Sequence, residues 1–216
     1  MSARAPHPPR ATRPRDAEAT RSALVAAAAA ELEDVGYDGT NTNRIARRAG
    51  YAPQSFYRHF ETKLDAFLAV YRAWVDAALE QVVEAADPAS IARKLVVHHR
   101  RARGFRRALR ALAVTDPRVR ALRATERQRQ IERLVTSQPS LASRPFDDLV
   151  ASLLTIERMV DALVEGELED LGMDEKIAHR RLATVVEREL LGPPPGTRPM
   201  KPSGHPRGAS KGRAND

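Results

Sequence analysis

The residues best suited to chemistry lie between Asn41 and Lys63, where the sequence reads NTNRIARRAGYAPQSFYRHFETK. This stretch contains five basic residues and one acidic residue. Many of its side chains can donate hydrogen bonds to base edges or phosphate oxygens. The candidates for DNA binding are Asn41, Thr42, Arg44, Pro53, Gln54, Ser55, Tyr57, Arg58, His59 and Lys63. Concentrated positive charge and hydrogen-bond donors predict a surface that binds nucleic acid.

Two short helices are expected to position these side chains. Asn41 is a favourable N-cap for a first helix over residues 42–49, and Gly50 suits the left-handed residue that follows a helix. Pro53 suits the first position of a second helix, residues 53–60, because its φ is fixed and that position needs no amide hydrogen. A helix-turn-helix places such a second helix in the major groove of DNA. The alternative is a helical hairpin with no role in DNA binding.

Residues 36–71 resemble the DNA-binding region of the TetR family of bacterial transcriptional regulators. The matching marks occur in order and at the family's spacing: Gly36-Tyr37, Ile45-Ala46, Ala49-Gly50, Tyr57, His59-Phe60 and Lys63. The resemblance covers residues 20–72, about a quarter of the chain. It implies an N-terminal three-helix DNA-binding domain, a helical domain that binds an effector and dimerises, and a phosphate contact by Lys63.

Three positions depart from the family's usual pattern. Ala52 stands where Ser or Thr usually caps the recognition helix and touches a phosphate, and Thr42 replaces an apolar residue. Gln54 replaces a small residue, and its amide can bond adenine bidentately, which makes it the first candidate for reading a base. The expected phosphate contacts are Asn41, Tyr57 and Lys63, and the expected base contacts are Gln54, Ser55 and Arg58.

The composition excludes several other classes of protein. With 216 residues the chain can bury a sizeable core. It contains no Cys, so neither a disulfide framework nor a cysteine-based metal site is expected. No apolar run approaches the length of a membrane span, and no apolar segment follows the basic N-terminus as in a secretory signal. We expect a cytoplasmic protein without a membrane partner or a cofactor.

The net charge of +8 lies entirely in the two ends of the chain. Residues 1–15 hold four Arg and no acid, and residues 192–216 hold five bases and one acid, whereas residues 16–191 are balanced. Both ends are rich in Pro, Gly, Ser and Arg, so we interpret them as disordered basic arms. They either add salt-sensitive affinity for phosphate or are simply solubilising. The expected domains between them are residues 16–62, which bind DNA, and residues 63–191, which bind the effector and dimerise.

Apolar residues at helical spacing predict an all-α fold. The expected helices after the helix-turn-helix cover residues 63–86, 89–113, 117–122 and 124–137, a helix opened by Pro145, and residues 174–191; a first helix covers residues 16–34. The helix opened by Pro145 is apolar on two sides, which indicates a partner. In the resembled family the last two helices form the dimer interface; the alternative is an intrachain hairpin.

The helix expected over residues 89–113 is strongly basic, with eight Arg or Lys and no acid between Ile91 and Arg110. His98 falls on its apolar stripe and His99 falls off it. One interpretation is a pocket wall for an anionic or polar ligand, with candidate effector residues Trp74, His98, Phe105 and Glu157. The other is a core histidine beside a basic face that the acidic residues of 145–192 neutralise, with Glu157 paired to an arginine.

The sequence therefore favours a homodimeric DNA-binding regulator, expected to be a repressor that leaves a palindromic operator when a small-molecule effector binds. The alternative is an effector-independent or architectural DNA-binding protein whose basic arms dominate binding. No glycine-rich phosphate loop, HExxH or GxSxG motif is present, so no enzymatic activity is expected.

Overall fold

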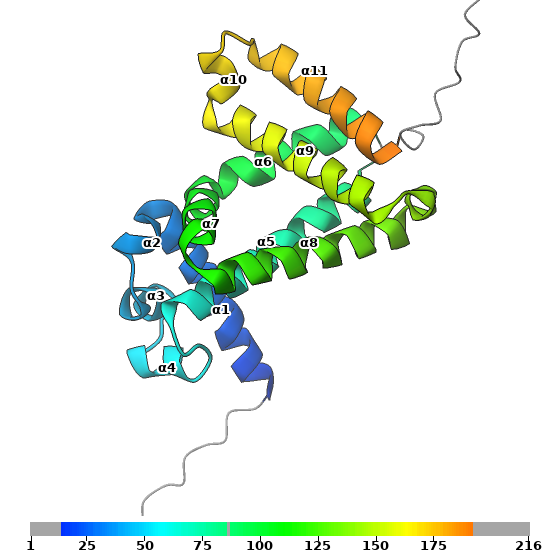
Figure 1. The fold of residues 1–216 in the computed structure, drawn as a ribbon. Coiled ribbons are helices and arrows are strands. Elements are labelled where there is room, and N and C mark those ends of the chain that lie inside the picture. Colours follow the sequence, from blue (N-terminus) through cyan, green and yellow to red (C-terminus); the bar gives the residue numbers. More distant parts are fainter. Residues whose placement is uncertain (1–13, 86, 192–216) are drawn as a thin grey trace, which may run out of the picture.

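The computed structural model describes residues 14–85 and 87–191, and the regular structure of these residues is entirely helical (Figure 1). The small N-terminal lobe contains α1 (Pro14–Asp34), α2 (Gly36–Gly39), α3 (Thr42–Arg48) and α4 (Pro53–Tyr57). The larger lobe contains α5 (Lys63–Val83), α6 (Pro88–Arg101), α7 (Arg103–Thr115), α8 (Pro117–Ser137), η1 (Pro139–Ser143), α9 (Phe146–Glu165), α10 (Glu167–Asp170), α11 (Glu175–Val186) and η2 (Glu187–Leu191). The expected all-α class is confirmed.

Helix α5 connects the two lobes. It begins with a capping box in which Thr62 Oγ1 accepts from Asp65 N at 3.2 Å and Asp65 Oδ2 accepts from Thr62 N at 2.8 Å. From there the helix runs into the centre of the larger lobe (Figure 1). Because it packs against α1, α6 and α8, its apolar side chains are covered from several directions.

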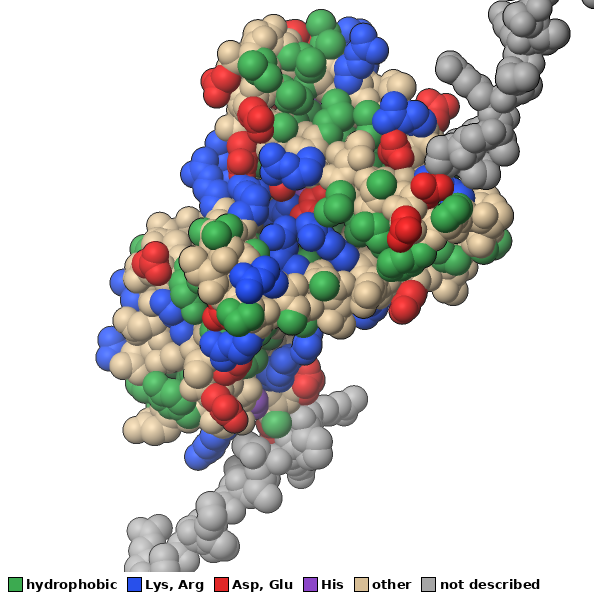
Figure 2. Space-filling view, viewed as in Figure 1, with side chains coloured by type: hydrophobic (Ala, Val, Ile, Leu, Met, Phe, Trp, Pro, Cys, Tyr) green, Lys and Arg blue, Asp and Glu red, His purple; other side chains and the backbone are tan. Residues whose placement is uncertain are grey.

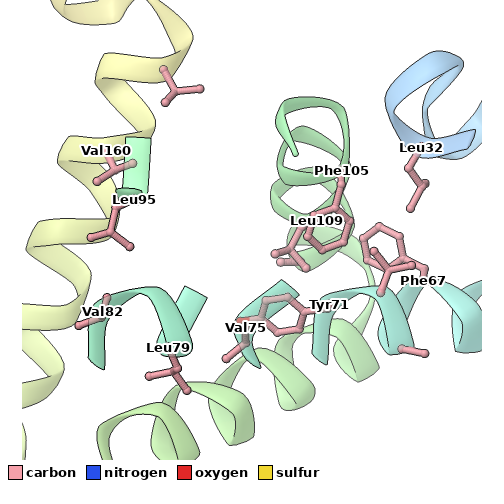
Figure 3. Close-up of a cluster of buried hydrophobic side chains, with 14 of the residues drawn as sticks. Leu32, Phe67, Tyr71, Val75, Leu79, Val82, Leu95, Phe105, Leu109 and Val160 are labelled. Atoms are coloured by element: carbon pink, nitrogen blue, oxygen red, sulfur yellow. The ribbon is translucent and has the colours of Figure 1, made fainter. Parts of the chain in front are cut away.

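A single hydrophobic cluster extends along α5 through both lobes. At one end Phe67 of α5 lies beside Leu32 of α1 and Phe105 of α7 (Figure 3). At the other end Val82 lies near Leu95 and Val160 (Figure 3). The N-terminal lobe therefore has no core of its own that is separate from the core of the larger lobe.

The contact between α1 and α7 is unusually close. Glu33 of α1 accepts hydrogen bonds from the backbone amides of Gly104 and Phe105, both at 2.8 Å, and so caps the first turn of α7. A Cβ atom at residue 104 would lie 2.7 Å from the carbonyl oxygen of Leu32. Glycine at this position therefore permits the close approach of the two helices.

The expectation of one helix over residues 89–113 was wrong. Helix α6 ends at Arg101, Ala102 has a non-helical backbone (φ −117°, ψ 31°), and α7 starts at Arg103 in a new direction. Glu33 explains the break. In a continuous helix the amides of Gly104 and Phe105 would donate to carbonyl oxygens of the preceding turn, whereas here they donate to the Glu33 carboxylate. The break allows Phe105 and Leu109 to face the core.

Other helix limits also differ from expectation. The two helices expected over 117–122 and 124–137 form one helix, α8, because residues 122–124 favour helix and the buried side chains at 119, 131 and 134 hold one continuous face. Helix α4 ends at Tyr57 instead of residue 60. After this end, the amides of His59 and Phe60 both donate to the carbonyl oxygen of Phe56. The last helix changes to a π-helical turn after Val186.

The basic arms lie largely outside the described residues. Residues 14 and 15, which were expected in the N-terminal arm, belong to α1. Within residues 14–85 and 87–191, no helix has the length and apolar character needed to cross a membrane.

Substituting Gly104 with Ala tests the α1–α7 contact. The added methyl group meets the backbone of Leu32 and Glu33, so the two helices must separate. Overpacking costs roughly 1–3 kcal/mol, which exceeds the gain of about 1 kcal/mol that alanine brings to a helix. We expect a lower free energy of unfolding in urea. Arg107→Ala, on the exposed face of α7, is the control; equal stability of Gly104→Ala and the native protein would contradict the contact.

Candidate DNA-binding surface and cavities of the helical domain

The helix-turn-helix is built from local capping interactions. Asn41 Oδ1 accepts from Arg44 N at 3.0 Å, which caps α3 as expected. Gly50 has φ +79° and reverses the chain after α3, and Pro53 occupies the first position of α4. Ala52 provides no side-chain cap for α4. Both helices are seated on the core by side chains buried underneath them, Ile45 and Ala46 from α3 and Phe56 from α4.

Glu31 of α1 holds α3 in place. Its carboxylate is buried and accepts from Arg44 Nε at 2.8 Å, Arg48 Nη1 at 3.1 Å and Thr40 Oγ1 at 3.0 Å. The hydrogen bond from Arg44 is the main cause that lowers the pKa of Glu31, so this carboxylate stays ionised. The side chain of Arg44 remains 48 % exposed, and this candidate therefore braces α3 and still reaches the surface.

Helix α4 directs its polar side chains outward. Gln54, Tyr57 and Arg58 are exposed, while Pro53, Ser55 and His59 are partly buried. The Tyr57 hydroxyl lies 3.0 Å from the Thr42 hydroxyl, which ties α4 to α3 and explains a polar residue at position 42. No such partner is present for Gln54, Ser55, Arg58 or His59 in the part of the chain that the structure describes. Their hydrogen-bonding groups are therefore available to a ligand.

Lys63 has a structural role that the sequence did not indicate. Its Nζ donates to the carbonyl oxygens of Tyr37 at 2.7 Å and Thr40 at 3.1 Å, and it lies 4.0 Å from the centre of the Tyr37 ring. These contacts fasten the start of α5 to the segment before α3. An ammonium group has three N–H donors, so one remains for the expected phosphate contact.

One exposed basic residue of the helix-turn-helix was not among the DNA-binding candidates predicted from the sequence. Arg47, in the last turn of α3, is exposed and makes no ion pair among the described residues. Arg48 beside it is instead held by Glu31 and by Asp34 at 2.6 Å. Spacing along α3 was not a usable signal, because Arg47 and Arg48 lie three and four residues from Arg44 and both spacings give neighbours on a helix.

The four effector candidates do not share one cavity. Trp74, His98 and Phe105 line an outer groove of about 730 Å³ between α1, α5 and the α6–α7 junction. Glu157 instead lines an inner cavity of about 60 Å³ between α5, α6, α8 and α9. Trp74 borders both spaces. Of the four candidates, Trp74, His98 and Phe105 therefore lie at the outer groove, while Glu157 lies at the inner cavity.

The positions of the two neighbouring histidines reverse the expectation. His99 was placed off the apolar stripe, yet it is only 4 % exposed, and its Nδ1 lies 2.9 Å from Asp161 Oδ1. His98 is partly buried, stacks on Trp74 with 4.7 Å between ring centres, and has Nε2 at 3.0 Å from the Trp74 carbonyl. Helix α6 packs against α5 on one side and α9 and α11 on others, so adjacent positions are both covered.

Three basic residues of the segment pair with acids of the last helices, as the second interpretation expected: Arg100 with Glu175, Arg106 with Glu157 and Asp161, and Arg110 with Asp161 and Glu165. Arg106 is 2 % exposed and bonds Glu157 at 2.8 Å and Asp161 at 2.6 Å. Burial raises the pKa of Glu157, but Arg106 and Arg127 outweigh burial and hold that pKa at about 2. The pairing of Glu157 with an arginine is therefore confirmed.

His98 should make stability depend on pH. Burial, and then its neighbour His99, lower the pKa of His98 from 6.5 to about 4. Between these two pH values the unfolded chain binds a proton that the folded chain does not, so the free energy of unfolding should fall as pH falls from 6.5 towards 4. The buried His99, whose pKa is also lowered, acts in the same direction. His98→Gln should flatten this slope in urea unfolding at pH 7.5 and 5.0; an unchanged slope would contradict the assignment.

Comparison with known proteins agrees with this architecture. Residues 24–70 match the family model described as bacterial regulatory proteins, tetR family. No curated protein sequence matches the chain.

Solved structures of similar fold are transcriptional regulators. A putative TetR-family regulator from Rhodococcus sp. has a TM-score of 0.63 and 19 % identity over 80 % of this chain and 99 % of its own. A TetR-family regulator from Streptomyces coelicolor has a TM-score of 0.54 and 25 % identity over 80 % of this chain and 98 % of its own. A putative regulator from Saccharomonospora viridis, in complex with choline, has a TM-score of 0.56 and 19 % identity over 79 % and 96 %. The matched N-terminal domain and the shared helical architecture support a transcriptional regulator of the TetR family.

Proposed function

We propose that this protein is a homodimeric transcriptional repressor that binds a palindromic operator and releases it when a small molecule binds the helical domain. The observation that carries the proposal is the outward face of α4. Gln54, Ser55 and Arg58 lie there with uncommitted hydrogen-bonding groups, in a segment of net positive charge, on a scaffold that Glu31 braces from behind. A rigid scaffold with free polar groups suits recognition of the major groove.

The DNA contacts fall into two groups. Gln54, Ser55 and Arg58 on α4 would read base edges, with Gln54 suited to adenine. The remaining candidates would position the domain on the phosphate backbone: Asn41, Thr42, Arg44, Pro53, Tyr57, His59 and Lys63. Because Asn41, Arg44 and Lys63 also hold the helix-turn-helix together, their loss would weaken both folding and binding.

A dimer is supported by the exposed apolar side chains of the last helices. Leu154 on α9 is 36 % exposed, Ile177 on α11 is 41 % exposed, and Phe146 and Leu191, at the start of α9 and the end of η2, are both 49 % exposed. Helix α9 already uses its other face against α6, α8 and α11. A second copy would cover this surface and set two recognition helices about 34–36 Å apart, one helical turn of DNA.

An effector site is supported by the outer groove. Its volume of about 730 Å³ lies within the range of roughly 300–1,000 Å³ typical for small-molecule sites. It is bordered by α1, which braces α3, and by α5, which enters the core, so an occupant would touch both lobes. The regulator of similar fold from S. viridis holds choline, which shows that this kind of protein can bind a small molecule. Release requires the ligand to bind the DNA-free conformation more tightly.

The alternative is a DNA-binding protein that needs no effector and relies on its basic arms. The outer groove favours the effector model, while the arms lie outside the described residues. The chain's similarity to transcriptional regulators gives no support to enzymatic activity.

Gln54→Ala tests base recognition. Sequences selected from random duplex DNA should share a palindromic consensus, and the substitution should weaken binding at defined base pairs by about 1–3 kcal/mol. Affinities are measured across a salt series, with Gln128→Ala, an exposed glutamine of α8, as the matched control. Uniform weak binding to every duplex, with a steep salt dependence and no effect of Gln54→Ala, would contradict recognition of an operator. It would support the alternative in which the basic arms dominate DNA binding.

Leu154→Asp tests the dimer. A buried, unpaired carboxylate in an apolar interface is strongly unfavourable, so the variant should sediment as a monomer under conditions in which the native protein sediments as a dimer. Val114→Asp is the control, because Val114 is 77 % exposed at the far end of α7. A native protein that sediments as a monomer would remove the dimer from the proposal.

A further inference from the structure

Arginine side chains of two helices surround the acidic face of a third. Arg106 and Arg110 of α7 are four residues apart and share one face, as do Arg123 and Arg127 of α8. The α7 pair faces Glu157, Asp161 and Glu165, which follow each other at intervals of four along α9, and the α8 pair faces Glu157. We call these seven residues the ionic cluster. Figure 2 shows basic side chains gathered with acidic ones on this face, where α7, α8 and α9 meet.

The ionic cluster has one positive charge in excess. Four guanidinium groups face three carboxylates, and burial lowers the pKa of the adjacent His99, so this histidine adds no positive charge at neutral pH. The carboxylates are shared unequally. Arg127 bonds Glu157 at 2.5 Å, and Arg110 pairs with Asp161 at 3.1 Å and also with Glu165.

Arg123 is the member of the cluster left without a hydrogen bond among the described residues. Its nearest carboxylate oxygen, on Glu157, is 3.7 Å away. Burial and the neighbouring Arg127 lower its pKa, but a guanidinium keeps its proton at neutral pH. The excess positive charge of the ionic cluster therefore persists at neutral pH, and it lies largely on the Arg123 side chain.

Three donors in the cluster lack an acceptor. The Nε atoms of Arg106, Arg123 and Arg127 are buried and have no hydrogen-bond partner within residues 14–85 and 87–191. A buried donor without an acceptor is unfavourable, and an unpaired buried charge more so. The pairs with Glu157 account for Arg106 and Arg127, but they leave Arg123 without an acceptor at hydrogen-bond distance.

We propose that the ionic cluster is a binding site for a small oxyanion, either a carboxylate or a phosphate, held by Arg123 with help from Arg127 and Arg110. These three side chains are 17 %, 26 % and 26 % exposed, so an anion can reach them from solvent. Planar guanidinium groups donate paired hydrogen bonds to both kinds of anion. A bound monoanion cancels the excess charge, and a cation is repelled. The site is separate from the outer groove.

Titration of the full-length protein without DNA tests the site. Acetate and inorganic phosphate are added separately at pH 7.5, with chloride keeping the ionic strength constant. Trp74 is the only tryptophan of the chain, and the Arg106 guanidinium lies 4.7 Å from its ring, so its fluorescence reports on the cluster. We expect saturation with one anion per chain, confirmed by calorimetry. Whichever anion binds more tightly identifies the class; no saturation by either overturns the proposal.

Two arginine variants of α8 localise the binding. Arg123→Gln should weaken the anion at least tenfold and leave the melting temperature near the native value, because Arg123 makes no hydrogen bond in the ionic cluster. Arg133→Gln removes the same charge from an exposed pair with Asp76 and should bind as the native protein does. An equal effect of both variants overturns the site. Because DNA is absent, this result is independent of whether an operator is recognised.

Discussion

The structure depends on the need to cover α5. Ten of its residues are buried, and they lie on more than one side of the helix, so no single neighbour can shield them. Helix α1 covers the beginning, α8 runs along the length and α6 packs against the end. Since the same helix starts beneath the helix-turn-helix and ends in the larger lobe, the position of α4 is set by packing in both lobes.

Charge provides the second constraint. The basic α6–α7 segment cannot approach the core unless acids meet it, and α9 supplies them through Glu157 and Asp161. Buried ion pairs are costly to desolvate, so each buried carboxylate here serves several donors. Asp161, for example, accepts from Arg106, Arg110 and His99. Helix α7 is thereby held by α9 along its side and by Glu33 of α1 at its first turn.

Features with local causes could be predicted from the sequence. Asn41 and Gly50 act within a few residues of their own positions, and they marked the helix-turn-helix. The break at Ala102 and the burial of His99 depend on Glu33 and Asp161, which are distant in sequence, and periodicity carries no such information. Gly104 inside a helical pattern was a usable signal of close backbone contact.

The shared core has a consequence for how the molecule is held together. Helices of four to seven residues, such as α2, α3 and α4, are not stable alone in water. Helices α3 and α4 persist because Ile45, Ala46 and Phe56 seat them on the same cluster in which Leu32, Phe67 and Phe105 join α1, α5 and α7. The proposed division near residue 62 is therefore one of roles, and we expect unfolding to be cooperative across it. Damage to packing deep in the larger lobe will lower the population of molecules able to present α4 at all.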